Sequence, residues 1–403
     1  MSTNATSKNA FFIGAICSFA YLSVYIARNI LSAVSPQMIS DGIFSANIIG
    51  TLSSVFFFAY AIGQLVNGLI GDVIKSKYMI TIGLLLAGIT SFILPIFYES
   101  TITTNFLYGL LGFALSMIYG PMTKAIAENT EPYHAIKCNL ALNFAAYFGA
   151  PLAGLLALAF LWDTAFKSSG IILCFMAVLC FVIFSYFEAK KIIVCKKSDD
   201  SQIEKKSDIK TSMNILFKRD IVKYTFVSIL TGIIRTSVLF WLPTYLMQYL
   251  NFSEKNSTSI FTATSLFISL GSFAAAYIYK LFRNNTDKTL IFSFLLAAIL
   301  FLGVFIIKQA VINILLLILA IVASNCAATM MWSFYCPSLA DTGLVSSATG
   351  YLDFISYMAA AISSKIFANA VGNIGWGGLI LVWFTLMIIG VIISIPYKKC
   401  CDV

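Results

Sequence analysis

The sequence predicts an all-α integral membrane protein with twelve transmembrane helices, arranged as two pseudo-symmetric halves of six helices each. Three observations predict this fold class. Of the 403 residues, 60% are hydrophobic and only 11% are charged, whereas about 25% of residues are charged in a soluble globular chain. The apolar residues form twelve long runs. An unusual spacing of arginine and proline occurs in both the first and the seventh of these runs.

The apolar runs are long enough to cross a bilayer as helices. A transmembrane helix needs roughly 20 mostly apolar residues, and its backbone polar groups must be satisfied within the segment. The runs do not alternate and are too long for barrel strands, so we expect helices. The predicted spans are 10–37, 46–71, 78–98, 103–127, 137–161, 168–189, 220–250, 256–281, 287–307, 309–335, 345–371 and 374–396.

Lysine and arginine are distributed unevenly between the loops. Of the 26 such residues, 20 lie in the tails and even-numbered loops and three lie in the odd-numbered loops. Because cytoplasmic loops carry the excess of positive residues, we expect both termini to be cytoplasmic, in a bacterial inner membrane. The net charge of +9 then reflects membrane topology, and we expect no nucleic-acid partner.

A charged segment divides the chain into two parts, and its central stretch "KKSDDSQIEKKSDIKTS" lacks aromatic residues. Residues 190–218 read as a flexible cytoplasmic linker between a first half at 1–189 and a second half at 219–403. Arg28 precedes Pro36 by eight residues in the first span, and Arg235 precedes Pro243 by eight residues in the seventh. Corresponding features in two halves are typical of duplicated transporter folds, whose substrate site lies near the middle of the membrane.

Few charges remain in the predicted hydrocarbon once the loop residues are set aside. They are the cations Arg28, Arg235 and Lys365 and one clear anion, Asp353. Such charges are costly and are functional hypotheses by default. Lys365 lies late in its span, so snorkelling to the interface and a functional role both stay open.

The two arginines predict an anionic ligand. A guanidinium group stays charged and binds phosphate oxygens with two parallel hydrogen bonds. Two of them, one from each half, can grip one phosphate, and the bound anion offsets their mutual repulsion. An empty site with two cations is unfavourable to move across the membrane, which favours an exchange mechanism.

Stripes of polar residues accompany the two arginines. Their members recur at helical spacing, which places them on one face of each span. We read them either as the lining of a wet cavity or as interhelical hydrogen bonds, and the residues alone leave both open. The stripes are Tyr21, Tyr25, Arg28 and Ser32; Tyr60, Gln64 and Asn67; Asn139, Asn143 and Tyr147; and Asp353, Tyr357 and Ser364.

The stretch "GLIGDVIKSK" lies between the second and third spans. Small residues such as Gly68 let helices approach closely, and Asp72 can cap or pair across a helix end. We assign both residues to gating and not to the substrate site.

These motifs resemble the major facilitator superfamily, and "GLIGDVIKSK" looks like its signature in the loop between spans 2 and 3. More narrowly, "YLSVYIARNILSAVSP", "YAIGQLVNGLIGD", "IIRTSVLFWLPTYL" and "SSATGYLDFISYMAAAISS" resemble the organophosphate:phosphate antiporter family. The resemblance implies that Arg28 and Arg235 grip phosphate. It also implies that Tyr21, Tyr25, Tyr60 and Tyr357 line the pocket.

The chain departs from that family at several pocket positions. The usual lysine of span 2 is Gln64, and the usual histidine of span 5 is Leu142, beside a retained Asn143. The tyrosine one turn before the second arginine is Gly232, and Asp353 is an added acid. The arginine pair is kept while the surrounding pocket is changed.

We therefore predict a secondary transporter that exchanges a small phosphorylated organic anion for inorganic phosphate by alternating access, acting as a monomer in the lipid bilayer. The extra acid Asp353 favours one alternative, a proton-coupled symporter of a carboxylate, sugar or amino acid. Another is a non-transporting membrane sensor of phosphorylated ligands. The nine cysteines lack metal-ligand spacing, and the sequence contains no GxxxxGK[ST] loop. We expect no enzyme activity, no cofactor and no metal.

Overall fold

A computed structural model of the chain describes residues 3–190, 192, 216–217, 219–339 and 345–396. All regular secondary structure within these ranges is helical, and a helix lies at each predicted span. The predicted all-α fold class is therefore confirmed. Residues 191, 193–215 and 218 of the predicted linker lie outside the described residues.

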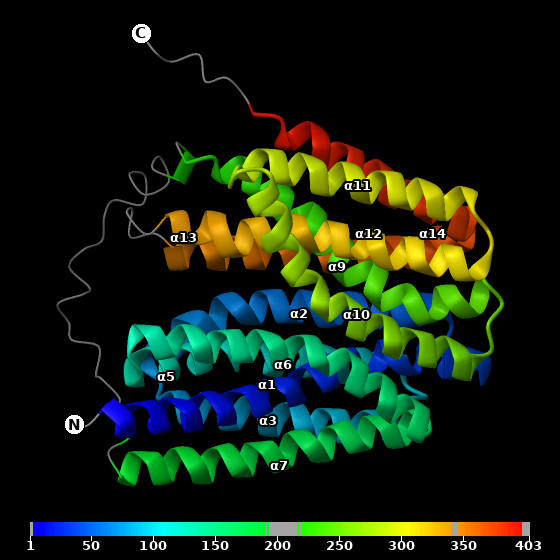
Figure 1. The fold of residues 1–403 in the computed structure, drawn as a ribbon. Helices are drawn as coiled ribbons and strands as arrows, with labels where there is room; N and C mark the ends of the chain where they lie inside the picture. Colours follow the sequence, from blue (N-terminus) through cyan, green and yellow to red (C-terminus); the bar gives the residue numbers. More distant parts are fainter. Residues whose placement is uncertain (1–2, 191, 193–215, 218, 340–344, 397–403) are drawn as a thin grey trace. The chain divides into compact units, whose positions relative to one another are not determined.

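The first seven helices cover the predicted spans 1 to 6. Figure 1 shows α1, α3, α6 and α7 running side by side, and α1 packs on both α6 and α7 while α3 packs on α7. The helices are α1 (Thr3–Ser40), α2 (Ala46–Val73), α3 (Ser76–Ile93), the short 3₁₀ turn η1 (Leu94–Ile96), α4 (Thr101–Ser116), α5 (Tyr119–Asn129), α6 (Pro132–Ala159) and α7 (Trp162–Ala189).

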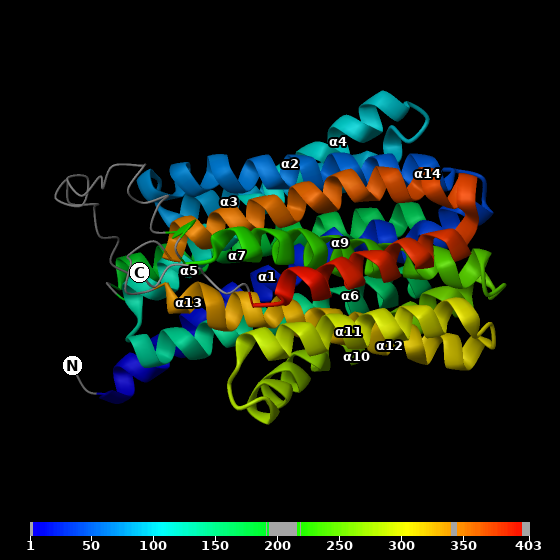
Figure 2. The ribbon, with the colours of Figure 1, turned by 90° about the horizontal axis from the view of Figure 1, so that it is seen from above.

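The remaining helices cover the predicted spans 7 to 12. Figure 2 shows α11, α12 and α14 running side by side, with α11 packed on both of the others. The helices are α9 (Ile221–Gln248), α10 (Glu254–Leu281), α11 (Thr286–Ile306), α12 (Ala310–Met330), the π-helical turn η3 (Met331–Tyr335), α13 (Cys336–Ser338) and α14 (Val345–Ser394).

Four predicted spans differ from single straight helices. Span 4 is broken between Ser116 and Tyr119, so α4 and α5 are separate helices. Span 10 contains a π-helical turn, a rare element in helices. Spans 11 and 12 form the 50-residue α14, in which two helices meet at Gly375 with φ 68° and ψ 178°. That backbone conformation is open to glycine and strained for other residues.

The chain divides into two compact units. Unit 1 comprises residues 1–206 together with 242–269, and unit 2 comprises 207–241 together with 270–403. Helices α9 and α10 therefore each contribute one part to each unit. The predicted halves at 1–189 and 219–403 stay a prediction.

Small residues hold the helices of unit 1 close together. A side chain added at Gly88 of α3 would lie 2.9 Å from the carbonyl oxygen of Gly170 in α7. A side chain at Gly170 would in turn lie 2.7 Å from the carbonyl oxygen of Gly88. Ser91 and Ser169 join the same two helices with a hydroxyl–hydroxyl hydrogen bond of 2.8 Å. This pattern of small and hydroxyl residues is typical of packing between helices in membranes.

The proline of the Arg–Pro spacing lies inside a continuous helix in each case, α1 for Pro36 and α9 for Pro243. A proline lacks the N–H that would bond to the carbonyl four residues earlier, which is that of Ser32 for Pro36. The hydroxyl of Ser35 donates to this carbonyl at 2.9 Å. Because the hydrogen of Ser35 is used in that bond, the hydroxyl of Thr244, 3.0 Å away, donates to Ser35. A side chain thus satisfies the backbone group that the proline frees.

Candidate functional site

The guanidinium of Arg28 lies among three aromatic rings in unit 1. Its central carbon is 5.2 Å from the ring centroid of Tyr25, 5.4 Å from that of Phe57 and 5.1 Å from that of Tyr60. Tyr25 is on the same helix, while Phe57 and Tyr60 come from α2. A cation within about 6 Å of ring centroids is attracted to the negative ring faces. These rings, here called the ring box, therefore offset part of the cost of placing a charge in an apolar helix bundle.

Two further series of rings extend from the ring box. Tyr21 packs edge-on against Tyr25 at 5.0 Å between centroids, and Tyr119 of α5 lies 5.3 Å from Tyr21. On the other side, Phe56 stacks on Tyr60 at 6.1 Å. The structure thus brings together the predicted site residues Tyr21, Tyr25 and Arg28 of one helix face and Tyr60 of α2.

Phe57 and Tyr119 were missed by the sequence analysis. Phe57 is apolar and sits in an apolar run, so nothing in its immediate sequence distinguishes it from a residue that faces lipid. A signal for Tyr119 does exist, because Gly120 and Pro121 follow it and a Gly-Pro pair marks a break in a helix.

Close packing of α6 on α1 fixes the backbone that carries Tyr25. A side chain at Gly149 of α6 would collide with the β-carbon of Tyr25 and would lie 2.7 Å from its backbone carbonyl carbon. The glycine is therefore required by proximity to α1. Leu142, at the expected histidine position, is buried in the core of the bundle.

The other predicted residues of unit 1 lie on α2 and α6. Gln64 is half-buried on α2, one turn after Tyr60. Tyr147 on α6 is 39% exposed. The side chain of Asn143 lies outside the described residues.

In unit 2, Arg235 is half-buried on α9, which packs along α14. The hydroxyl of Ser228 donates to the carbonyl oxygen of Leu352 at 2.6 Å, and the hydroxyls of Ser237 and Ser363 are 3.0 Å apart. These two contacts fix the register of the two helices. Asp353 follows Leu352 and therefore lies at the level of Ser228 along the helix axis. Arg235 comes seven residues after Ser228, so at a rise of 1.5 Å per residue it lies roughly 10 Å further along the axis.

The same register explains why this chain has glycine at position 232. A side chain there would lie 2.8 Å from the backbone oxygen of Ser356 and would collide with its hydroxyl. The tyrosine implied by the family resemblance has no room between α9 and α14. Tyr357, one turn after Asp353, is buried, and Asp353 itself is half-buried.

The remaining predicted charges fall outside these two clusters. Lys365 is exposed on α14, and both interpretations of this residue stay open. The approach of Arg28 to Arg235 in one chamber stays a prediction.

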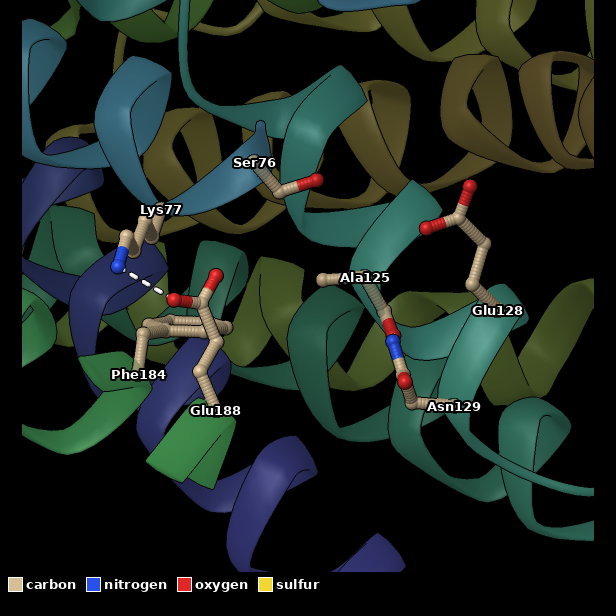
Figure 3. A pocket seen from close by; sticks show the side chains of 7 residues that line it. All are labelled: Ser76, Lys77, Ala125, Glu128, Asn129, Phe184 and Glu188. Carbon is tan, nitrogen blue, oxygen red and sulfur yellow. Dashed lines mark hydrogen bonds and ion pairs between the residues drawn. The ribbon is translucent and has the colours of Figure 1, made fainter. Parts of the chain in front are cut away.

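The predicted gating residues lie at the end of α2, and an ion pair lies just beyond them. Gly68 and Asp72 belong to the last two turns of α2, and their side chains lie outside the described residues. Lys77, at the end of the same motif, forms an ion pair with Glu188 of α7. In Figure 3 these two side chains point toward one another, and the carboxylate of Glu128 lies apart from them. The pair joins α3 to α7 beside a pocket lined by Ser76, Lys77, Ala125, Glu128, Asn129, Phe184 and Glu188.

Lys77→Gln is expected to slow transport about two- to fivefold while leaving the KM for substrate unchanged, because this partly buried ion pair joins α3 to α7 and is expected to bias conformation without touching the cargo. The charge-swapped variant Lys77→Glu with Glu188→Lys should recover most of the lost rate. Initial rates in proteoliposomes measure both effects. A raised KM in the single variant would contradict the assignment to gating.

Comparison with known proteins identifies the fold. The family model described as Major Facilitator Superfamily matches residues 17–364. The chain belongs to the Major Facilitator Superfamily. It also superposes on the crystal structure of a D-xylose–proton symporter with a TM-score of 0.76 and 14% identity, covering 96% of this chain and 98% of that one. At that identity the likeness supports the fold alone.

Several curated relatives from bacteria are similar in sequence over different lengths. The hexuronate transporter of Bacillus subtilis is 24% identical over 277 residues, which is 67% of this chain and 64% of that protein. The membrane sensor protein UhpC of Escherichia coli is 30% identical over 69 residues, 17% of this chain and 16% of that protein. A probable hexose phosphate transport protein of Chlamydia pneumoniae is 30% identical over 71 residues, 18% of this chain and 16% of that protein. In all three cases the match spans less than two thirds of the relative.

Membership of this superfamily and the long apolar helices show that the chain is a multi-pass membrane protein. Ten helices in the described ranges are long and apolar enough to span a membrane, and one of them, at 348–394, contains the Gly375 junction of the last two predicted spans. Within the same ranges no group of three or more His, Cys, Asp or Glu residues is arranged to hold a metal ion.

Proposed function

We propose that this facilitator is a secondary transporter of a small organic anion, and that the anion is a phosphorylated metabolite exchanged for inorganic phosphate. The observation that carries the proposal is the placement of Arg28. Ring faces from α1 and α2 hold its guanidinium, and an oxyanion can accept two parallel hydrogen bonds from the same group. The second arginine, Arg235, occupies the corresponding place in the repeated Arg–Pro pattern.

Phosphate esters are the favoured cargo for two reasons. The fork of a guanidinium matches the oxygens of phosphate, and two such groups suit a ligand that carries up to two negative charges. Local similarity to a probable hexose phosphate transport protein and to the sensor UhpC supports this class of ligand, as does the resemblance to the organophosphate:phosphate antiporters.

Exchange follows from the charge of the empty site. Two guanidinium groups that share one site concentrate positive charge there, and the two halves rock around this site during alternating access. A bound phosphate or phosphate ester offsets this charge in both directions of the cycle. Reorientation is therefore expected to be fast with either anion and slow without one.

An exchange assay in proteoliposomes tests the proposal. Vesicles preloaded with phosphate should take up labelled glycerol 3-phosphate or hexose 6-phosphate without a pH gradient, and empty vesicles should not. Release of labelled phosphate should match the uptake mole for mole. Uptake that needs a pH gradient and ignores internal phosphate would contradict the proposal.

A second candidate is proton-coupled symport of a carboxylate with Asp353 as the proton site. It is favoured by the similarity to a hexuronate transporter, which spans 67% of this chain. It is also favoured by the position of Asp353, which is half-buried and follows Leu352, whose carbonyl accepts a hydrogen bond from Ser228 of α9. A sugar or amino acid cargo belongs to the same candidate.

Asp353→Asn separates the two candidates. If Asp353 carries the coupled proton, uptake driven by a pH gradient should fall at least about tenfold, because the amide cannot bind and release a proton. If exchange with phosphate operates, exchange should persist with altered selectivity or pH response. Rates at several external pH values, with and without internal phosphate, provide the measurement.

A third candidate is a membrane sensor, in keeping with the short match to UhpC. Saturable binding of a sugar phosphate without any counterflow in the exchange assay would favour it. We also propose that both termini lie in the cytoplasm, on the basis of the uneven distribution of lysine and arginine. The bacterial relatives favour a bacterial inner membrane, and a monomer is the working assumption of the proposal.

A further inference from the structure

The break in span 4 places two tyrosines of one span on either side of the ring box. Helix α4 ends at Ser116 and α5 begins at Tyr119. The hydroxyl of Ser116 donates to the carbonyl of Phe113 at 2.6 Å and accepts from the amide of Asn67 at 2.8 Å. The end of α4 is therefore tied to α2, the helix that provides half of the ring box.

Tyr108 supports the ring box through α2. It lies on α4, 5.1 Å from Phe56 between ring centroids, and Phe56 stacks on Tyr60. Tyr108 is only 2% exposed, so it is a core residue whose loss would disturb packing generally.

Tyr119 supports the ring box through α1. Its ring lies 5.3 Å from Tyr21 at an interplanar angle of 30°, and Tyr21 packs edge-on against Tyr25. Tyr119 is 36% exposed, and a side chain at the neighbouring Gly120 would meet nothing within 4 Å. The ring of Tyr119 thus contacts the site from an element with open space beside it, which distinguishes it from the buried Tyr108.

We propose that Tyr119 is a positioning residue of the anion site, which holds the guanidinium of Arg28 in place through Tyr21 and Tyr25. Tyr21 has the ring of Tyr119 on one side and that of Tyr25 on the other. Without Tyr119, Tyr21 and then Tyr25 gain rotamer freedom, and one of the three faces over Arg28 is lost for part of the time. The role of this site in binding an anion rests on the proposed function. The contacts that lead from Tyr119 through Tyr21 and Tyr25 to Arg28, here called the contact chain, are a property of unit 1.

Chemical modification of Arg28 tests the contact chain without any substrate. The full-length protein in detergent is treated with phenylglyoxal, which reacts with guanidine groups, and the labelled peptides are quantified by mass spectrometry over time. In Tyr119→Leu the modification rate of Arg28 should rise about two- to fivefold, which is the factor that corresponds to loss of one exposed cation–π contact. The rate at Arg235, in unit 2, should not change.

Two variants serve as controls. Tyr119→Phe keeps the ring and should leave the rate at Arg28 unchanged. Tyr277→Leu removes a tyrosine of α10 that is 72% exposed and should also have no effect. An unchanged rate at Arg28 in Tyr119→Leu would overturn the proposal. An equal increase at Arg235 would do so too, because that result indicates general loosening.

Phosphate binding provides the second readout. In proteoliposomes, Tyr119→Leu should raise the KM for inorganic phosphate about two- to fivefold with little change in maximal rate, and Tyr119→Phe should match the wild type. A fall in maximal rate at constant KM would contradict a positioning role. If the wild type does not transport phosphate at all, the proposed function fails, and the modification rates still decide whether Tyr119 positions Arg28.

Discussion

Arg28→Lys is expected to reduce anion exchange by at least about 100-fold, since two or more charge-assisted hydrogen bonds of the guanidinium fork are replaced by the weaker contacts of an ammonium group. The planar guanidinium also stacks on ring faces from Tyr25, Phe57 and Tyr60, whereas an ammonium is a compact, strongly hydrated point charge. Phosphate-driven uptake of a labelled sugar phosphate in proteoliposomes measures the effect.

The substitution keeps the positive charge, so membrane insertion and folding should be preserved. Expression level, gel-filtration profile and thermal midpoint are expected to match the wild type. Arg283→Lys is the matched control, because Arg283 is exposed in the turn after α10 and should tolerate the change. Exchange near the wild-type level in Arg28→Lys would remove Arg28 from the substrate site.

Gly149→Ala is expected to lower stability by about 1–3 kcal/mol and to abolish most transport, because the added methyl group overpacks the interface of α6 and α1. The added methyl group would meet the β-carbon and the backbone atoms of Tyr25. These atoms cannot rotate away as the end of a flexible side chain could. Helix α1 would have to shift, and the ring of Tyr25 would shift with it relative to Arg28. A thermal melt in detergent and an exchange assay measure the two effects.

Gly372→Ala is the control for the general effect of replacing a helical glycine. Gly372 is exposed on α14, and an added side chain would meet nothing within 4 Å. Its melting temperature should stay the same or rise slightly, because alanine favours helix more than glycine does. If Gly149→Ala melts and transports like Gly372→Ala, the close approach of α6 to α1 is not required.

Most of the fold could be predicted from the sequence because crossing a bilayer imposes a local requirement. A span must be apolar over its own length, so each apolar run is visible without knowledge of its neighbours. The same argument made Arg28 and Arg235 stand out, because a charge in hydrocarbon is costly wherever the rest of the chain lies. Spans 11 and 12 were separated correctly, and the positive φ of Gly375 marks their junction.

The details of the site depended on contacts that no local pattern contains. Tyr21, Tyr25 and Tyr60 were predicted from helical spacing, since spacing decides which residues share a face of one helix. Phe57 was missed because its role is to cover a cation on another helix. Tyr119 was missed because span 4 was predicted as one helix, whereas it breaks after Ser116.

At two of the positions that differ from the pattern of the organophosphate:phosphate antiporters, the sequence shows the change while the structure shows its surroundings. The sequence revealed that position 232 is glycine but not why. The structure supplies the reason, which is the backbone of Ser356 at 2.8 Å from any added side chain. At position 142 the leucine is a buried core residue.

The sequence by itself determined that this is a multi-span helical membrane protein with two costly arginines in matching places, because hydrophobic length and isolated charge are properties of single segments. Only the tertiary structure decided which rings surround Arg28, where span 4 breaks and which glycines are needed for close approach. Those features depend on distances between residues far apart in the chain, and such distances are set by packing.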